Sequence, residues 1–122
     1  MGLKHPTSKS FSYAWQGLKL CFRYEPNFRI HLIFAAGAIA FGWVLGLESV
    51  EWLMLVMTIF LVIILELLNT VLEAIVDLVS PDIKPAAKKA KDVSAAMVLV
   101  SAIFSIVVGL ILFLPKILFL YY

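Results

Sequence analysis

The segment ELLNTVLEAIVDLVS, residues 66–80, places an amide and three carboxyl groups in an apolar sequence without glycine or proline. At about 100° per residue, an α-helix brings Glu66, Asn69, Glu73 and Asp77 onto one narrow face. At about 1.5 Å per residue, the resulting polar stripe is roughly 16 Å long. An acid in the middle of a membrane helix costs at least about 2.5–3.5 kcal/mol to insert, so the stripe has to face protein, water or metal.

The rest of the chain has the composition of a membrane protein. Of its 122 residues, 63% are hydrophobic and only 15% are charged, with a net charge of +2, whereas soluble domains carry about 25% charged residues. This composition excludes an ordinary soluble domain and a disordered chain. The length predicts one membrane domain, residues 1–122.

Three apolar stretches are long enough to cross a bilayer, which takes about 20 residues. We predict membrane helices over about residues 30–47, 51–79 and 92–117, the second of which carries the polar stripe. Pro81 and Pro85 end the second helix and shape a polar connection to the third.

The basic residues predict the orientation of these spans. All of them except Lys116 precede the first span or lie between the second and the third, and loops rich in Lys and Arg stay in the cytoplasm. We therefore expect a cytoplasmic N-terminus and an external C-terminus. The residues on the cytoplasmic side are Lys4, Lys9, Lys19, Arg23, Arg29, Lys84, Lys88, Lys89 and Lys91.

The segment at about residues 8–25 predicts an amphipathic helix in the plane of the membrane surface. Phe11, Trp15 and Phe22 recur at helical spacing, with polar and basic residues on an adjoining face. The alternative is a basic flank that only fixes topology. Pro26 breaks this helix and places Glu25 at the membrane surface.

The stripe favours metal-dependent phosphate chemistry. One cysteine and two distant histidines leave only carboxylates as metal ligands, and hard cations such as Mg²⁺ take carboxylates together with substrate phosphates. Lys91 and Asp92 are expected at the depth of the stripe, where they can bind and orient phosphate. Asp92 can instead cap the third helix, and the other lysines of the connection can be topology signals alone. The stripe itself can instead be a hydrogen-bonding device that holds an oligomer together.

The residues resemble the prokaryotic membrane diacylglycerol kinase family, which includes undecaprenol kinases. The resemblance rests on ELLNTVLEAIVDLVS and on AKKAKDVSAAMVLV, residues 87–100, with YAWQGLKLCFRYEPNFRIH and FLPK extending it over most of the chain. It implies an all-α homotrimer with three membrane helices and a surface helix in each subunit. Active sites shared between subunits are then expected on the cytoplasmic side of a prokaryotic cytoplasmic membrane.

The resemblance also implies roles for the polar residues. Glu66 matches the general base that takes the proton of a lipid hydroxyl, and Glu25 and Glu73 match ligands of the divalent metal. The positions that complete the nucleotide and phosphate site are Asn69, Asp77, Lys91 and Asp92. The chain departs from the pattern at Lys84, Ala95 and His31, where relatives carry histidine, serine and an acid.

The sequence thus predicts an ATP- and Mg²⁺-dependent lipid kinase acting in phospholipid or lipid-carrier metabolism. NFRIHL and FLPK resemble the Gram-positive-type branch of the family, whose members are often undecaprenol kinases, and this resemblance slightly favours undecaprenol over diacylglycerol as the acceptor. No nucleic-acid partner is expected, and no glycine-rich phosphate loop occurs. The alternatives are a small oligomeric channel or transporter and a non-catalytic membrane assembly protein.

Overall fold

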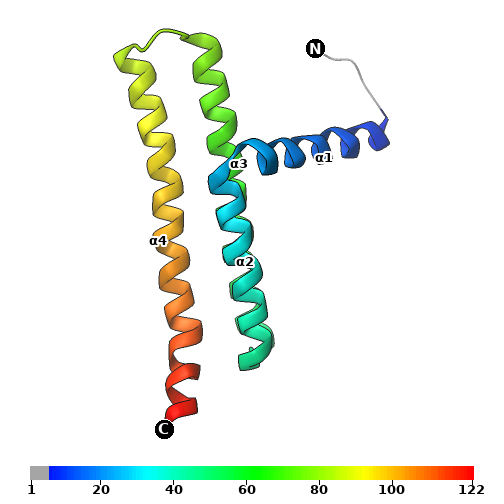
Figure 1. The fold of residues 1–122 in the computed structure, drawn as a ribbon, viewed down its shortest axis with the longest axis vertical. Helices are drawn as coiled ribbons and strands as arrows, with labels where there is room; N and C mark the ends of the chain where they lie inside the picture. Colours follow the sequence, from blue (N-terminus) through cyan, green and yellow to red (C-terminus); the bar gives the residue numbers. More distant parts are fainter. Residues whose placement is uncertain (1–5) are drawn as a thin grey trace.

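The computed structural model describes residues 6–122 and consists of four α-helices (Figure 1). Helix α2 (Pro26–Leu45) runs antiparallel to α3 (Ser49–Val79), and α4 (Pro85–Tyr121) returns along α3. Helix α1 (Thr7–Tyr24) leaves this bundle sideways. The predicted all-α architecture with three helices long and apolar enough to cross a membrane is confirmed. Lys4, included among the basic residues of the cytoplasmic side, lies outside the described residues.

The corner between α1 and α2 is made by a single residue. Glu25 ends α1 and begins α2 with an extended backbone, and Pro26 is the first helical residue of α2. Proline fits there because its fixed φ suits a first turn, where its missing N–H is not needed. The Arg29 guanidinium donates hydrogen bonds of 2.9 Å to the backbone carbonyls of Phe22 and Arg23. Arg29 therefore binds the last turn of α1 to the first turn of α2.

The turn between α2 and α3 depends on two glycines. Gly46 adopts a left-handed conformation with φ of 71°, which glycine takes without the clash of a side chain. The backbone N–H groups of Gly46 and Leu47 both donate to the carbonyl of Gly42. Because Gly42 has no side chain, Leu47 and Trp52 pack directly over its backbone. A capping box between Glu48 and Glu51 then begins α3.

Two helices begin before the predicted membrane segments. Helix α2 starts at Pro26 rather than near residue 30, and α4 starts at Pro85 rather than near residue 92. The charge-free runs mark the part of a helix that sits in hydrocarbon, whereas a polar first turn can extend into water. Pro85, like Pro26, supplies a favourable first residue. Asp92 therefore lies well inside α4, and the alternative that it caps this helix is wrong.

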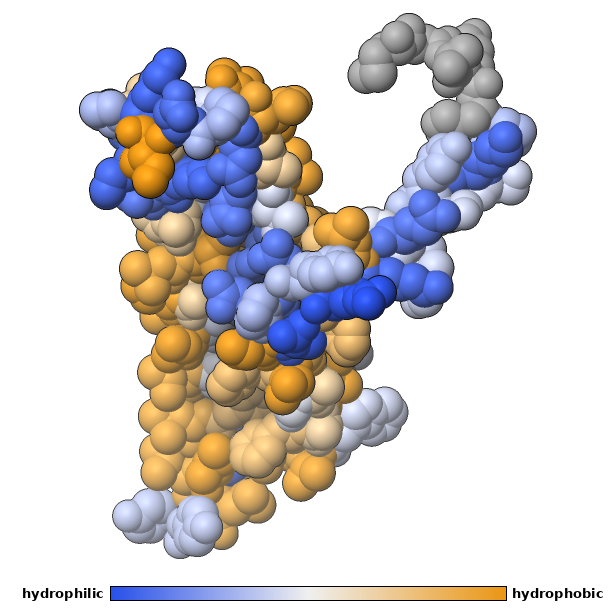
Figure 2. Space-filling model, turned by 45° about the horizontal axis from the view of Figure 1, so that its top comes forward, coloured by the Kyte–Doolittle hydropathy of each residue, from blue (hydrophilic) through white to orange (hydrophobic). Residues whose placement is uncertain are grey.

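The surface divides into an apolar bundle and a hydrophilic end. Apolar residues cover most of α2, α3 and α4, and hydrophilic residues gather where α3 turns into α4 and along α1 (Figure 2). At the opposite end, Lys116 forms an ion pair of 3.1 Å with Glu51, which joins α4 to the start of α3. The buried apolar core also lies in that half of the bundle and consists of Leu47, Leu55, Val108 and Leu112.

We expect Gly42→Ala to lower the free energy of unfolding by about 1–3 kcal/mol, the usual cost of overpacking. A Cβ at this position would lie 2.8 Å from Leu47 Cδ1 and 2.9 Å from Trp52 Cη2. The matched control is Gly37→Ala, because no atom lies within 4 Å of a Cβ there. Helix propensity should leave this control unchanged or up to about 1 kcal/mol more stable. Unfolding in detergent, followed by circular dichroism, measures both; equal stability of the two variants contradicts the packing.

Cys21 is the buried residue of α1 and its thiol lies beside Thr70 of α3, so its reactivity reports whether α1 is docked on α3. Burial raises the pKa of its thiol, and the negative charge of Glu25 raises this pKa further. The thiolate is the form that reacts with alkylating reagents, so maleimide labelling of the folded protein should be slow at pH 7 and should accelerate above pH 9. Labelling of the unfolded chain at pH 7 is the control and should be fast. Rapid labelling of the folded protein at pH 7 would show that α1 detaches from the bundle.

Candidate active site

The polar stripe begins at the most deeply buried side chain of α3. Glu66 is 1% exposed, and its Oε2 atom has no hydrogen-bond partner among the described residues. Nε2 of His31 on α2 lies 3.6 Å from this oxygen. This distance is too long for a hydrogen bond. A buried carboxylate oxygen is thus left without a direct hydrogen-bond donor, which is costly unless a ligand or water completes the site.

One turn further along α3, Asn69 is held by a residue of α4. The Ser94 hydroxyl, in a residue only 4% exposed, donates a hydrogen bond of 2.7 Å to Asn69 Oδ1. This contact directs the amide Nδ2 of Asn69 towards Glu73, whose Oε1 it meets at 3.4 Å. Sequence reasoning missed Ser94. Its position three residues after Lys91 on the same helical face was the available signal.

The end of the stripe farthest from Glu66 lies beside the polar start of α4. Lys91 forms an ion pair of 2.5 Å with Asp77. Asp92 lies apart from this pair, because its carboxylate binds Lys88 at 2.5 Å on the same helix. Of the residues predicted from sequence, the structure links Asn69 with Glu73 and Asp77 with Lys91, and it leaves Asp92 on the exposed side.

The carboxylates around Glu66 fit a divalent cation that takes part of its coordination from a substrate. Glu73 follows Glu66 by two turns on α3, and Glu25 lies at the start of α2, the helix that brings His31 to 3.6 Å from Glu66. Glu25 precedes α2 as its N-cap residue, but among the described residues its carboxylate makes no capping hydrogen bond to this helix, so it can serve as a ligand. Within residues 6–122, no three His, Cys, Asp or Glu side chains form a complete metal cage. Mg²⁺ commonly binds one or two carboxylates and completes its shell with phosphates and water, so a pair of carboxylates suits it.

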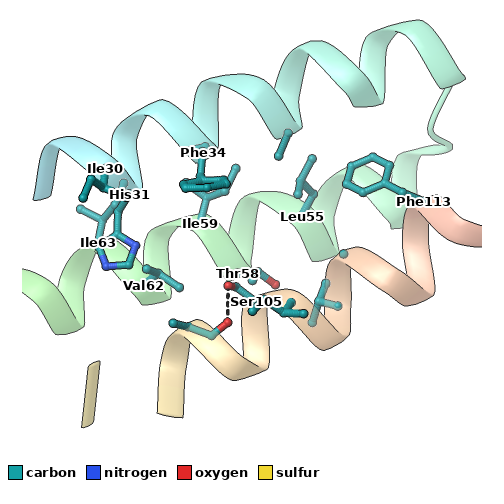
Figure 3. A pocket seen from close by; sticks show the side chains of 16 residues that line it. Ile30, His31, Phe34, Leu55, Thr58, Ile59, Val62, Ile63, Ser105 and Phe113 are labelled. Atoms are coloured by element: carbon teal, nitrogen blue, oxygen red, sulfur yellow. Dashed lines mark hydrogen bonds between the residues drawn. The ribbon is translucent and has the colours of Figure 1, made fainter. Parts of the chain in front are cut away.

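An apolar cavity of about 370 Å³ lies between α2, α3 and α4. His31 lies towards one end of it and Phe113 towards the other (Figure 3). The two hydroxyls in the lining bind carbonyls of their own helices: Thr58 donates to Met54 at 2.8 Å and Ser105 to Ala102 at 2.7 Å. The cavity therefore presents hydrocarbon along its length and polar groups at the end near Glu66.

The sequence is similar to proteins of known activity. The profile of prokaryotic diacylglycerol kinase matches residues 12–113. An undecaprenol kinase of Bacillus subtilis is 40% identical over 108 residues, which cover 88% of each chain. A diacylglycerol kinase of Synechocystis is 45% identical over 110 residues; the match covers 89% of this chain and 63% of that longer relative. A diacylglycerol kinase of Helicobacter pylori is 35% identical over 96 residues, or 79% of this chain and 75% of the relative.

The family match extends over all of α2 and α3 and most of α1 and α4. It thus includes every polar residue of the candidate active site. The chain belongs to the prokaryotic diacylglycerol kinase family.

Proposed function

We propose that this protein transfers the γ-phosphate of ATP to the hydroxyl of a membrane lipid alcohol. The observation that carries the proposal is the buried Glu66, whose Oε2 has no hydrogen-bond partner among residues 6–122 and lies 3.6 Å from Nε2 of His31, a residue that lines the apolar cavity. A lipid alcohol likewise has one polar group, the hydroxyl at the membrane interface, and a long hydrocarbon part that lies in the bilayer. The undecaprenol and diacylglycerol kinases among the relatives support this chemistry.

Glu66 is the proposed general base. It accepts the proton of the lipid hydroxyl while the hydroxyl oxygen forms a bond to the γ-phosphorus, and the bond from that phosphorus to the bridging oxygen of ADP breaks. Its position suits this role, because the buried Oε2 has no hydrogen-bond partner among residues 6–122 and is free to accept the proton.

The rest of the stripe is proposed to hold the nucleotide. Glu25 and Glu73 would bind Mg²⁺, which supplies positive charge to the ATP phosphates. Lys91 exchanges its contact with Asp77 for a phosphate oxygen when the nucleotide binds, and Asn69 donates its amide hydrogens to the phosphates. Asp77 and Asp92 orient the cationic side chains around the nucleotide.

Undecaprenol is the slightly favoured acceptor, with diacylglycerol as the other candidate. The Bacillus undecaprenol kinase matches 88% of its own length, which supports this order. The lining of the cavity is mostly apolar, so it does not distinguish the hydrocarbon of one lipid from that of the other.

The proposed setting is a prokaryotic cytoplasmic membrane, with the N-terminus in the cytoplasm and the C-terminus outside. The hydrophilic end of the bundle and the lysines at the start of α4 support this orientation, because basic segments stay in the cytoplasm (Figure 2). Helix α1 then lies on the membrane surface. We further propose a homotrimer with shared active sites, supported by the incomplete burial of the stripe within one chain, where Glu73 is half-buried and Asp77 is exposed.

A channel and a non-catalytic assembly protein are both disfavoured. The relatives are lipid kinases, and a through-path for ions needs polar groups across the whole bilayer. Towards the outer end of α3, the stretch from Trp52 to Leu65 carries only Thr58 as a polar residue.

Replacing the proposed base tests the function directly. Glu66→Gln should lower lipid phosphorylation at least 10³-fold, because the amide cannot accept the proton. Phosphate transfer from labelled ATP to undecaprenol and to diacylglycerol is measured in mixed micelles with Mg²⁺. The control is Glu48→Gln at the opposite end of the bundle, which should keep normal activity. Turnover by Glu66→Gln above one-tenth of the normal rate, with both variants equally folded, contradicts the role of Glu66.

Ser94 should act on nucleotide binding through Asn69. Ser94→Ala removes the hydrogen bond that orients the amide, which costs about 1 kcal/mol, so KM for ATP should rise about fivefold. KM for the lipid should stay constant, and Ser94→Thr, which keeps a hydroxyl, should remain close to the unmodified protein. If KM for ATP is unchanged in Ser94→Ala, the proposal that Ser94 orients Asn69 for nucleotide binding is contradicted.

A further inference from the structure

We propose that His31 is a binding residue for the acceptor hydroxyl. Its Nε2–H donates a hydrogen bond to the oxygen of the lipid alcohol, while the hydroxyl hydrogen is donated to Glu66 Oε2. The inference deepens the proposed function, on which it rests, because it assigns the group that recognises the reacting oxygen.

The separation of the two side chains supports a bridging ligand. His31 Nε2 and Glu66 Oε2 are 3.6 Å apart, too far for a direct hydrogen bond. One oxygen atom can lie within about 2.8 Å of both, which is ordinary hydrogen-bond distance. That oxygen has to accept from the imidazole and donate to the carboxylate, and a hydroxyl does both at once.

The two protein groups lack other partners for these bonds. Glu66 Oε2 is buried without a hydrogen bond in the described part of the chain. Among residues 6–122, the only polar contact of the His31 ring is the one with Glu66. Its side chain is 19% exposed, so little water can replace the missing partner. A bridging hydroxyl would satisfy both groups.

The cavity places the hydrocarbon of an alcohol below this bridge. His31 lines the cavity, and its ring extends from α2 towards Val62 and Ile63 of α3 (Figure 3). The hydroxyls of Thr58 and Ser105 are already used by backbone carbonyls of their own helices. His31 is therefore the lining side chain, within the described residues, with a strong donor left for a ligand.

The bridge would also prepare the hydroxyl for reaction. A hydrogen bond from His31 to the oxygen fixes the direction of the O–H bond, so that its hydrogen points to Glu66. One lone pair of the oxygen then remains for the γ-phosphorus. Orientation of this kind contributes to rate as well as to binding.

The test compares an alcohol with a ligand that lacks only the hydroxyl. Equilibrium binding of a labelled C15 polyprenol and of its deoxy hydrocarbon is measured without ATP, in micelles, for the unmodified protein, His31→Leu and His31→Gln. Phosphorylation kinetics follow on the same preparations. Ile33→Leu is the matched control on α2, because Ile33 is 71% exposed and does not line the cavity.

We expect the unmodified protein to prefer the alcohol over the hydrocarbon about tenfold, and His31→Leu to lose this preference while binding the hydrocarbon normally. KM for the alcohol should rise about tenfold in His31→Leu, with KM for ATP unchanged, since one hydrogen bond of about 1.4 kcal/mol is lost. His31→Gln, which keeps a donor, should return to within threefold of normal.

Two results would overturn the assignment. One is an unchanged preference for the alcohol in His31→Leu, and the other is equal weakening of both ligands, which indicates a change in cavity shape. A preference that depends on His31 without any phosphate transfer by the unmodified protein would support the hydroxyl site and contradict the proposed kinase activity. Normal phosphate transfer by all variants would support the kinase activity and contradict a role of His31 in it.

Discussion

A carboxylate buried in an apolar bundle is the constraint on which this structure depends. Glu66 has almost no exposure, and the bundle offers its Oε2 no direct hydrogen bond. An uncompensated group of this kind is expensive to bury, so the surrounding helices have to be held by other interactions. Ion pairs join α3 to α4 at the two ends of the bundle, Asp77–Lys91 at one end and Glu51–Lys116 at the other, and Arg29 holds α1 to α2 at their corner.

The helices arrange the polar groups in order of depth. Helix α3 carries Glu66, Asn69, Glu73 and Asp77 in this order towards its C-terminal end, and hydrophilic residues gather where α3 turns into α4 (Figure 2). On one side of Glu66, the cavity is lined mostly by apolar side chains. At the other end of the stripe, near Asp77, lysines of α4 supply positive charge. A membrane alcohol and a water-soluble phosphate donor can thus approach one point from opposite directions. In the proposed reaction, that point is Glu66.

Sequence alone predicted the features that follow from periodicity and hydropathy. The polar stripe, the three spans and the break at Pro26 all result from rules that act over a few neighbouring residues. The contacts between Ser94 and Asn69 and between His31 and Glu66 were not predictable in this way, because they join residues of different helices whose relative rotation depends on packing. The early start of α4 was missed because hydropathy marks where a helix is embedded and not where it begins.

The single-residue corner at Glu25 restricts where this chain can gain or lose residues. One residue serves as the end of α1 and the start of α2, so the connection has no spare residues. Inserting or deleting a single codon there would rotate α1 by about 100° about its own axis. Cys21, the buried residue of α1, would then turn away from Thr70 of α3. Length changes among homologues should therefore be confined to the termini and to the turn between α3 and α4, where residues 80–84 are non-helical.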